Sequence, residues 1–192
     1  MPNIKATDLG LTLKRQHIFS GLHFKIQQGE GLVITGPNGS GKTLLLRLLA
    51  GKLKPSSGKL FKDRHFSNQQ YCDFDSKIDE YLSVSQFYSC WGNSTTQDET
   101  IDQWNLSSIW KRRLDRISLG EKKRAKLATA LSHNPSFLLL DEPDLGLDQG
   151  HASLMADIFS AIPSSCTTIL TSHHEEIYDS LGWEKLSLRG ES

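Results

Sequence analysis

The stretch GPNGSGKT, residues 36–43, constrains the fold of this chain more than any other feature. It lies between a short apolar run, LVIT, and a longer apolar stretch, KTLLLRLLAG. The first run predicts a buried strand, and the second predicts a buried helix that ends at Gly51. A strand, a glycine-rich loop and a helix in this order indicate an α/β fold with a mostly parallel sheet.

The residue types of this loop indicate phosphate binding. Glycines let backbone N–H groups turn inward around phosphates, and the following helix directs its positive end at the anion. Lys42 is expected to reach the β- and γ-phosphates, and the Thr43 hydroxyl to ligate Mg²⁺. The alternative is a glycine-rich turn that carries its lysine by chance. The nucleotide-binding residues expected here are Gly36, Pro37, Asn38, Gly39, Ser40, Gly41, Lys42 and Thr43.

Two carboxylates, Asp141 and Glu142, follow the apolar run FLLL. Burying them in the centre of a core would be costly, whereas the carboxyl end of a parallel strand faces the crevice where α/β sheets bind ligands. Asp141 is therefore expected to hold Mg²⁺ through its shell, and Glu142 to polarise the attacking water as general base. The alternative is a strand end that carries solvated acids.

The basic cluster SLGEKKRAK, residues 118–126, has three interpretations: a nucleic-acid patch, a solvated helix face, or part of an anion site. The whole chain has 22 basic and 22 acidic residues. Because proteins that rely on counterion release from nucleic acids usually carry a basic excess, this balance argues against the first. We expect no nucleic-acid partner.

The bulk composition predicts one soluble intracellular domain. A chain of 192 residues is long enough for one core. Its three cysteines show no CxxC spacing, which is typical of reduced thiols inside the cell. No apolar run approaches the ~18 residues that cross a bilayer. We expect a cytoplasmic protein that reaches a membrane only through a partner.

The remaining pattern predicts further elements. Residues 9–26 predict two strands joined by a polar turn, and residues 71–115, with three of the four tryptophans, a small helical insert. Helices are expected over 119–132 and 149–162, and strands over 137–140, over 167–170 and at EKLSL near the end. We divide the single domain, 1–192, into a core of residues 1–70 and 129–192 and a helical and signature part of residues 71–128.

Five motifs together resemble one family. The phosphate loop, ISLGEKKR, FLLLDEP, LGLD and ILTSHH follow the order and spacing of ATP-binding cassette (ABC) ATPases, and the resemblance covers essentially the whole chain. It implies the ABC type of phosphate-loop fold: a mostly parallel sheet core, an antiparallel N-terminal β part and a small helical insert. It also implies ATP and Mg²⁺ as cofactors, hydrolysis of ATP coupled to transport, a second cassette as a homodimer partner, and an integral membrane subunit.

The resemblance assigns SLGE, which begins at Ser118, as the signature motif. The Ser118 hydroxyl and Gly120 amide would contact the γ-phosphate of ATP held by a second copy, because a helix start favours an anion. Leu119 and Glu121 depart from the usual LSGGQ, and Glu121 adds negative charge near the site. Most lysines beyond the motif are expected to form a solvated helix face.

Three more assignments come from the resemblance. His173 matches the switch histidine that contacts the γ-phosphate and orders the attacking water. Asp148 of LGLD would lie at the dimer seam. A glutamine after the strand near Phe66 would contact Mg²⁺ and pass the nucleotide state to the insert; Gln69 is favoured over Gln70.

The aromatic residue that usually stacks on adenine in this family is missing from LTLKR, residues 11–15. Leu11 or Leu13 could pack on the base instead, or Arg15 could stack over it.

The N-terminal half resembles one branch of the family most: the small ATP-binding subunit of the haem exporter of cytochrome c biogenesis, through FSGL-x-F, LLRLLAG and the short length. A soluble cassette ATPase that acts on ribosomes is the alternative, favoured by GEKKR. A phosphate-loop nucleotide kinase is a third, disfavoured by the signature, the histidine and the lack of an arginine-rich lid.

Overall fold

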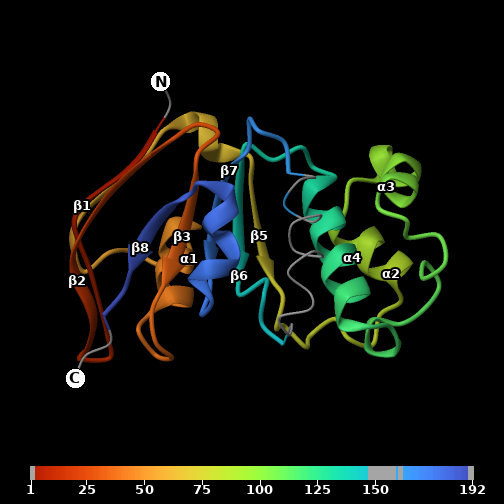
Figure 1. Ribbon diagram of the computed structural model, residues 1–192, viewed down its shortest axis with the longest axis horizontal. Coiled ribbons are helices and arrows are strands. Elements are labelled where there is room, and N and C mark those ends of the chain that lie inside the picture. Colours follow the sequence, from red (N-terminus) through yellow and green to blue (C-terminus); the bar gives the residue numbers. More distant parts are fainter. Residues whose placement is uncertain (1–2, 147–158, 160–161, 190–192) are drawn as a thin grey trace.

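The computed structural model describes residues 3–146, 159 and 162–189. Within them, two sheets and a group of helices follow one another in layers (Figure 1). The strands are β1 Asn3–Leu13, β2 Gln16–Gln27, β3 Gly31–Thr35, β4 Ser57–Lys62, β5 Gln69–Asp73, β6 Phe137–Asp141, β7 Thr167–Thr171 and β8 Glu184–Ser187. The α-helices are α1 Lys42–Leu49, α2 Val84–Trp91, α3 Gln97–Gln103 and α4 Leu119–Leu131.

The central sheet has the order β5-β6-β7-β3-β8, and its neighbouring strands run parallel. Every residue of β3, β6 and β7 is buried. A parallel sheet covered on both faces needs such continuous apolar strands, and LVIT, FLLL and TTIL supply them. The parallel sheet predicted from the sequence is confirmed, and its strands end together at one edge.

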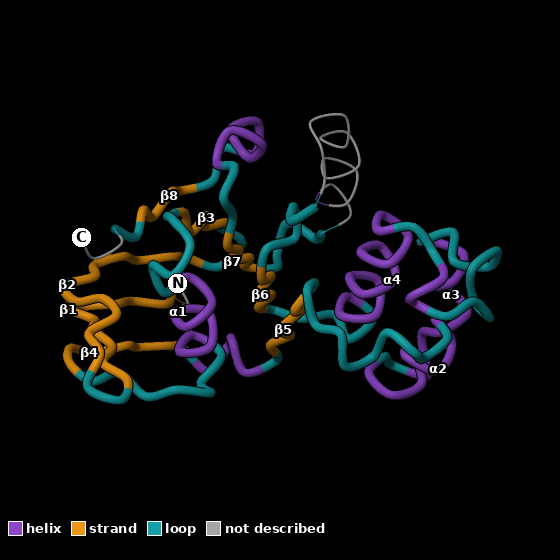
Figure 2. The backbone as a smooth tube through the Cα atoms, turned by 90° about the horizontal axis from the view of Figure 1, so that it is seen from below, coloured by secondary structure: helices purple, strands orange, loops and turns teal. Residues whose placement is uncertain are grey.

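Helix α1 lies between the central sheet and a second, antiparallel sheet of order β2-β1-β4 (Figures 1 and 2). Four of the eight residues of α1 are buried leucines, and they pack against both sheets. They join one core with residues of β1, β2, β3, β6 and β7. Sandwiching the helix between two sheets fixes the phosphate loop at its start.

The opposite face of the central sheet carries α4, with α2 and α3 outside it (Figure 2). Strand β5 belongs to the sheet, so the division that we placed after residue 70 is wrong: it cuts β5, and the helical part begins after Asp73. Phe66 lies in a 3₁₀ turn, Arg64–Ser67, rather than in a strand. The helix predicted over 149–162 and Asp148 fall outside the described residues, apart from Phe159 and Ile162.

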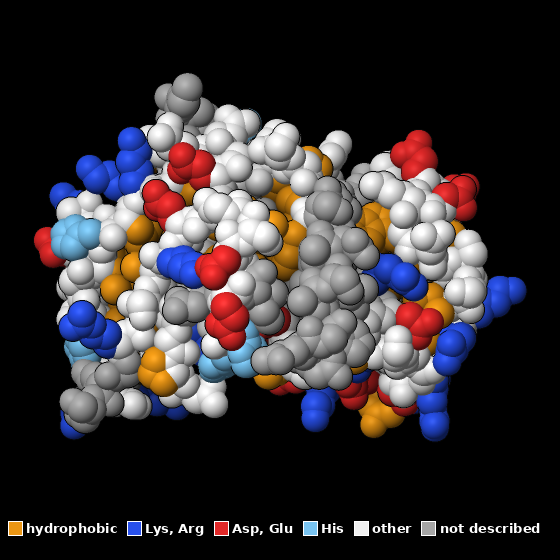
Figure 3. All heavy atoms as spheres, in the orientation of Figure 1, with side chains coloured by type: hydrophobic (Ala, Val, Ile, Leu, Met, Phe, Trp, Pro, Cys, Tyr) orange, Lys and Arg blue, Asp and Glu red, His pale blue; other side chains and the backbone are white. Residues whose placement is uncertain are grey.

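Charge is mixed on the face shown in Figure 3, where lysine or arginine and acidic side chains both occur over the sheets and over the helical part. Of the helices in the described part of the chain, none combines the length and apolar character needed to cross a bilayer.

Candidate nucleotide site

The loop before α1 has a backbone that glycine alone accommodates at two positions. Gly41, which caps α1, has φ 93°, and a Cβ there would lie 2.5 Å from Ile18 Cγ2. Gly36 has φ 147°, and its Cβ would lie 2.4 Å from the Leu188 carbonyl oxygen. Both positions therefore exclude a side chain. The crest of the loop, Pro37 to Gly39, is exposed, whereas Ser40 is buried.

Lys42 begins α1 and folds back over the loop. Its side chain is buried, and Nζ donates to the carbonyl oxygens of Gly36 at 3.0 Å and Pro37 at 3.3 Å. Burial lowers the pKa of Lys42, and the nearby charge of Glu142 opposes that shift. The ammonium group is thus held at the mouth of the phosphate loop, as its sequence position predicts.

Asp141, at the end of β6, is surrounded by hydroxyl groups. Its Oδ1 accepts hydrogen bonds from Thr43 Oγ1 at 3.1 Å and Thr171 Oγ1 at 2.8 Å, and its Oδ2 accepts one from the Tyr71 hydroxyl at 2.8 Å. Sequence reasoning found Asp141 and Thr43 but missed the other two. Thr171 had a usable signal, since it ends the strand TTILT beside β6. Tyr71 was missed because the sequence analysis placed it in the helical insert rather than in strand β5.

The oxygen atoms at this point suit Mg²⁺. A hydroxyl and a carboxylate lie 3.1 Å apart beside a phosphate loop. Mg²⁺ prefers oxygen ligands and usually takes one or two from the protein, with waters and substrate phosphates completing its shell. Thr43 and Asp141 therefore fit the ion that the sequence predicts.

Glu142, His173 and Lys42 come together from three separate segments. His173 Nε2 lies 2.9 Å from Glu142 Oε1. Lys42 Nζ lies 3.2 Å from His173 Nε2, 3.5 Å from His173 Nδ1 and 3.9 Å from Glu142 Oε1. An imidazole protonated at Nε2 donates to Glu142, and the Lys42 ammonium lies beside the ring at nearly equal distances from its two nitrogens. The chain thus brings the expected base, the expected switch histidine and the loop lysine into one cluster.

The backbone of Glu142 is strained. Its φ of 50° lies in the left-handed region, which a residue with a long side chain rarely adopts, and its N–H donates to Thr171 Oγ1 at 2.9 Å. Such strain costs on the order of 1–3 kcal/mol and is concentrated at functional sites. Here it turns the carboxylate out of the strand direction and toward His173.

Ser118 caps α4 in a reciprocal arrangement with Glu121. Glu121 N–H donates to Ser118 Oγ at 3.2 Å, and Ser118 N–H and Oγ–H donate to Glu121 Oε2 at 2.8 and 2.9 Å. These hydrogen bonds lower the pKa of Glu121. The first turn of α4, including Gly120, therefore carries its own carboxylate. Among the described residues, the hydrogen bonds of the Ser118 hydroxyl and amide go to Glu121 and not to the phosphate loop of its own chain.

Gln69 does not belong to this site, and its assignment is corrected. It starts β5, opposite Phe137, whereas Asp73 is the residue opposite Asp141. Four residues of strand separate the two ends by about 13 Å. The Gln69 amide instead donates to the Ala50 carbonyl at 2.8 Å and accepts from Lys62 at 2.6 Å. Gln70 is no substitute, since it also lies in the amino half of β5 and lines a groove.

Among the candidates for packing on the base, Leu11 is excluded because it is buried in the core between the two sheets. Leu13 is partly buried and Arg15 exposed. Ile18 contacts the loop at Gly41 and is half-buried, so sequence reasoning missed an apolar side chain that borders the site.

The expectation of a solvated lysine face on α4 is wrong for two residues. Lys123 is 2% exposed, and its Nζ donates to the carbonyls of Pro143 and Leu145. Lys126 is 4% exposed, and its Nζ donates to the carbonyls of Asp73 and Ser76, each at 3.1 Å. Both lysines therefore tie α4 to loops that leave the sheet at the nucleotide edge.

Comparison with known proteins gives one consistent result. The family model described as "ABC transporter" matches residues 19–145. The cytochrome c biogenesis ATP-binding export protein CcmA of Mesorhizobium japonicum is 33% identical over 169 residues, which cover 81% of this chain and 83% of that protein. The zinc import ATP-binding protein ZnuC 2 of Hahella chejuensis is 34% identical over 176 residues, which cover 88% of this chain and 72% of that protein.

Solved structures share this fold. The crystal structure of a nucleotide-free ATP-binding cassette from an ABC transporter superposes with a TM-score of 0.80 at 17% identity, covering 100% of this chain and 90% of the other. The architecture above is therefore that of an ATP-binding cassette.

Proposed function

This chain belongs to the ABC transporter family and is an ATP-binding subunit with the ATPase activity of that family, and on this premise we propose how its residues act and what it transports. The observation that carries the proposal is the cluster of Lys42, Glu142 and His173 beside the hydroxyl-bound Asp141.

The roles of the side chains follow from their geometry. Lys42 and the loop amides bind the β- and γ-phosphates. Glu142 accepts a proton from the attacking water, and His173 orients both Glu142 and that water. Mg²⁺, when bound between Thr43 and Asp141, would neutralise charge on the phosphates. The hydrogen bond of 2.9 Å between His173 and Glu142 supports this assignment, because it fixes the general base before substrate arrives.

A second copy of the chain completes the site in this proposal. Ser118 and Gly120 begin α4, where unpaired N–H groups and the helix dipole favour an anion. Closure would require the Ser118 hydroxyl to exchange its hydrogen bond to Glu121 for one to the γ-phosphate of the partner's ATP. A mixture of Ser118→Arg and Glu142→Gln chains should then recover activity that each lacks alone, since one site of the mixed dimer is intact.

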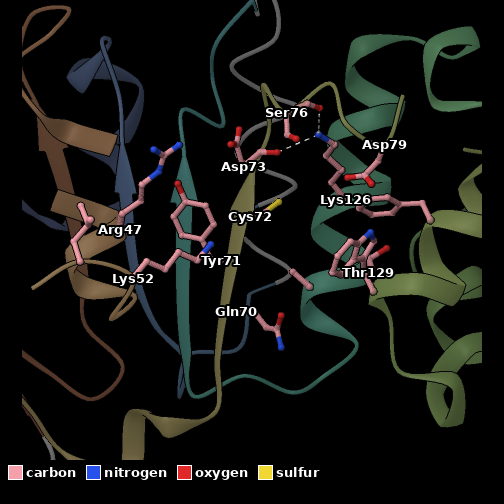
Figure 4. Close-up of a pocket in the computed structure, with 14 residues that line it drawn as sticks. Arg47, Lys52, Gln70, Tyr71, Cys72, Asp73, Ser76, Asp79, Lys126 and Thr129 are labelled. Carbon is pink, nitrogen blue, oxygen red and sulfur yellow. Dashed lines mark hydrogen bonds between the residues drawn. The ribbon is translucent and has the colours of Figure 1, made fainter. Parts of the chain in front are cut away.

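The membrane partner would dock in the groove between α1, β5 and the helical part. This groove encloses about 590 Å³ and is lined by apolar and charged side chains, among them Arg47, Tyr71, Asp79, Phe87 and Trp91 (Figure 4). Ile78 and Tyr81, on the segment after β5, are 88% and 75% exposed. A cytoplasmic helix that presents apolar side chains suits this surface.

For the cargo, we propose haem, exported for cytochrome c biogenesis. The support is the resemblance of the N-terminal half together with the CcmA relative that is 33% identical over 169 residues. Zinc import is the competing function, because the identities are nearly equal.

Deleting the gene and measuring covalent haem in c-type cytochromes tests the proposal. We expect loss of holo-cytochrome c, restored by the wild-type chain but not by Lys42→Ala. Normal cytochromes with a growth defect in zinc-depleted medium would overturn haem in favour of zinc. Purification of the chain with ribosomes, rather than with a detergent-solubilised membrane protein, would overturn transport altogether.

A further inference from the structure

Tyr71 joins two regions that the sequence does not connect. It stands opposite Leu139 in the pairing of β5 with β6, two residues before the position of Asp141. Since side chains two residues apart share a face of a sheet, the Tyr71 ring extends along the same face as the Asp141 carboxylate. The hydroxyl reaches Asp141 Oδ2 at 2.8 Å, close to the best distance for O–H···O⁻.

The two oxygens of Asp141 are not equally supported. Thr43 and Thr171 both donate to Oδ1, whereas Oδ2 receives its hydrogen bond from Tyr71. Asp141 is 5% exposed, so water is a poor substitute for a missing donor. Without the Tyr71 hydroxyl the carboxylate is held at one oxygen and is able to turn about its terminal torsion, which has a broad energy minimum.

The rest of the Tyr71 side chain is held firmly in place. Its ring lines the groove described above, and the Lys52 ammonium lies 4.1 Å from the ring centroid (Figure 4). A tyrosine phenol ordinarily keeps its proton near neutral pH, so it acts here as a hydrogen-bond donor.

We propose that Tyr71 is a positioning residue of the nucleotide site, which holds the Asp141 carboxylate with Oδ1 facing Thr43 and thereby sets the affinity for the divalent ion. The inference rests on the proposed site, and it adds a residue that neither the phosphate loop nor the strand end FLLLDEP contains.

The test is Tyr71→Phe in the full chain, which removes one oxygen and keeps the ring. Mn²⁺, as a paramagnetic substitute for Mg²⁺, is titrated by electron paramagnetic resonance with a non-hydrolysable ATP analogue present. Loss of a hydrogen bond to a charged group corresponds to a weakening of Mn²⁺ binding by about tenfold. Binding of the analogue in EDTA should stay within about twofold of wild type, since Asp141 acts through the ion.

Turnover supplies a second measurement. The Mg²⁺ concentration for half-maximal ATP hydrolysis should rise by the same factor, with kcat at saturating Mg²⁺ nearly unchanged. A merely structural role would lower stability without moving the Mg²⁺ requirement.

The matched control is Tyr88→Phe. Tyr88 in α2 donates to the Asn93 carbonyl at 2.9 Å, far from Asp141, so this variant loses a tyrosyl hydrogen bond without touching the site. It should bind Mn²⁺ as wild type does. Equal weakening in both variants would overturn the proposal, because the effect would then be general destabilisation.

A double-mutant cycle tests the route through Asp141. In an Asp141→Asn background, Tyr71→Phe should cause no further loss of Mn²⁺ affinity. Additive losses, or a wild-type Mn²⁺ affinity for Tyr71→Phe alone, would refute the role of Tyr71. If the wild-type chain fails to bind the ATP analogue at all, it is the proposed nucleotide site that fails.

Discussion

Lys123→Met probes a buried ionisable group on α4. Lys123 is 2% exposed on α4, and burial lowers its pKa from the ordinary 10.5 to about 8, with the charge of Asp144 opposing the shift. Below pH 8 the folded chain keeps a buried ammonium. Between pH 8 and 10.5 the folded lysine is neutral while the unfolded one is still charged. The unfolded state then binds more protons, so stability rises with pH across this window.

The size of the effect follows from the two pKa values. They lie about 2.5 pH units apart, and each unit corresponds to about 1.4 kcal/mol, so the rise is about 3 kcal/mol over the whole window. Methionine has similar length and no charge, so Lys123→Met removes this pH dependence. It also removes the hydrogen bonds to the carbonyls of Pro143 and Leu145, which lowers stability at every pH.

The assay is urea unfolding at pH 7 and pH 10, followed by tryptophan fluorescence. From pH 7 to pH 10, the free energy of unfolding of wild type should rise by about 2–3 kcal/mol more than that of Lys123→Met. The control Lys111→Met removes an exposed lysine and should keep the wild-type pH dependence. If the free energies of unfolding of wild type and Lys123→Met change equally with pH, Lys123 is not a buried ammonium in the folded chain.

Four further variants test other parts of the molecule. Lys42→Ala should abolish ATP hydrolysis at saturating Mg-ATP while circular dichroism stays unchanged, and wild-type turnover would contradict the phosphate-loop assignment. His173→Ala should leave ATP binding within about threefold and lower kcat by roughly 10²-fold in steady-state assays, because it frees Glu142 from its orienting partner. Gly31→Ala should lower stability by about 1–3 kcal/mol in urea, since a Cβ there would lie 2.1 Å from a ring atom of Trp183; no change would mean that the indole swings aside. Glu121→Gln should keep the helix cap but increase the ATP-dependent dimer fraction in analytical ultracentrifugation, because it removes a negative charge where phosphate would bind; a smaller fraction would argue against Ser118 as the partner's contact.

Most of the site could be predicted because its residues come from local motifs. Lys42 and Thr43 follow a loop whose spacing is specific, and Asp141 and Glu142 end an apolar run, so their place at the sheet edge follows from strand direction alone. The contact of His173 with Glu142 needed the additional knowledge that β7 lies beside β6.

The errors have two physical causes. Strand β5, QQYCD, has no apolar run to announce it, because it lies at the edge of the sheet and is only partly buried. Misplacing it moved the glutamine assignment to the wrong end of the strand and hid Tyr71. Lys123 and Lys126 were misjudged because lysine is rarely buried, and only the folded chain reveals the backbone carbonyls that accept from them.

Helix α4 is anchored along its whole length. Lys123 and Lys126 hold its middle to the carboxyl edge of the sheet, and Asn68 holds the turn beyond its end through the carbonyls of His133 and Asn134. These hydrogen bonds therefore fix the distance between the phosphate loop and Ser118 of the same chain. In a two-fold dimer, the movement that brings the phosphate loop of one chain to Ser118 of its partner brings the partner's phosphate loop to Ser118 of the first chain. Closing one ATP site would then bring the two faces of the other site nearer to each other, whether or not that second site holds ATP.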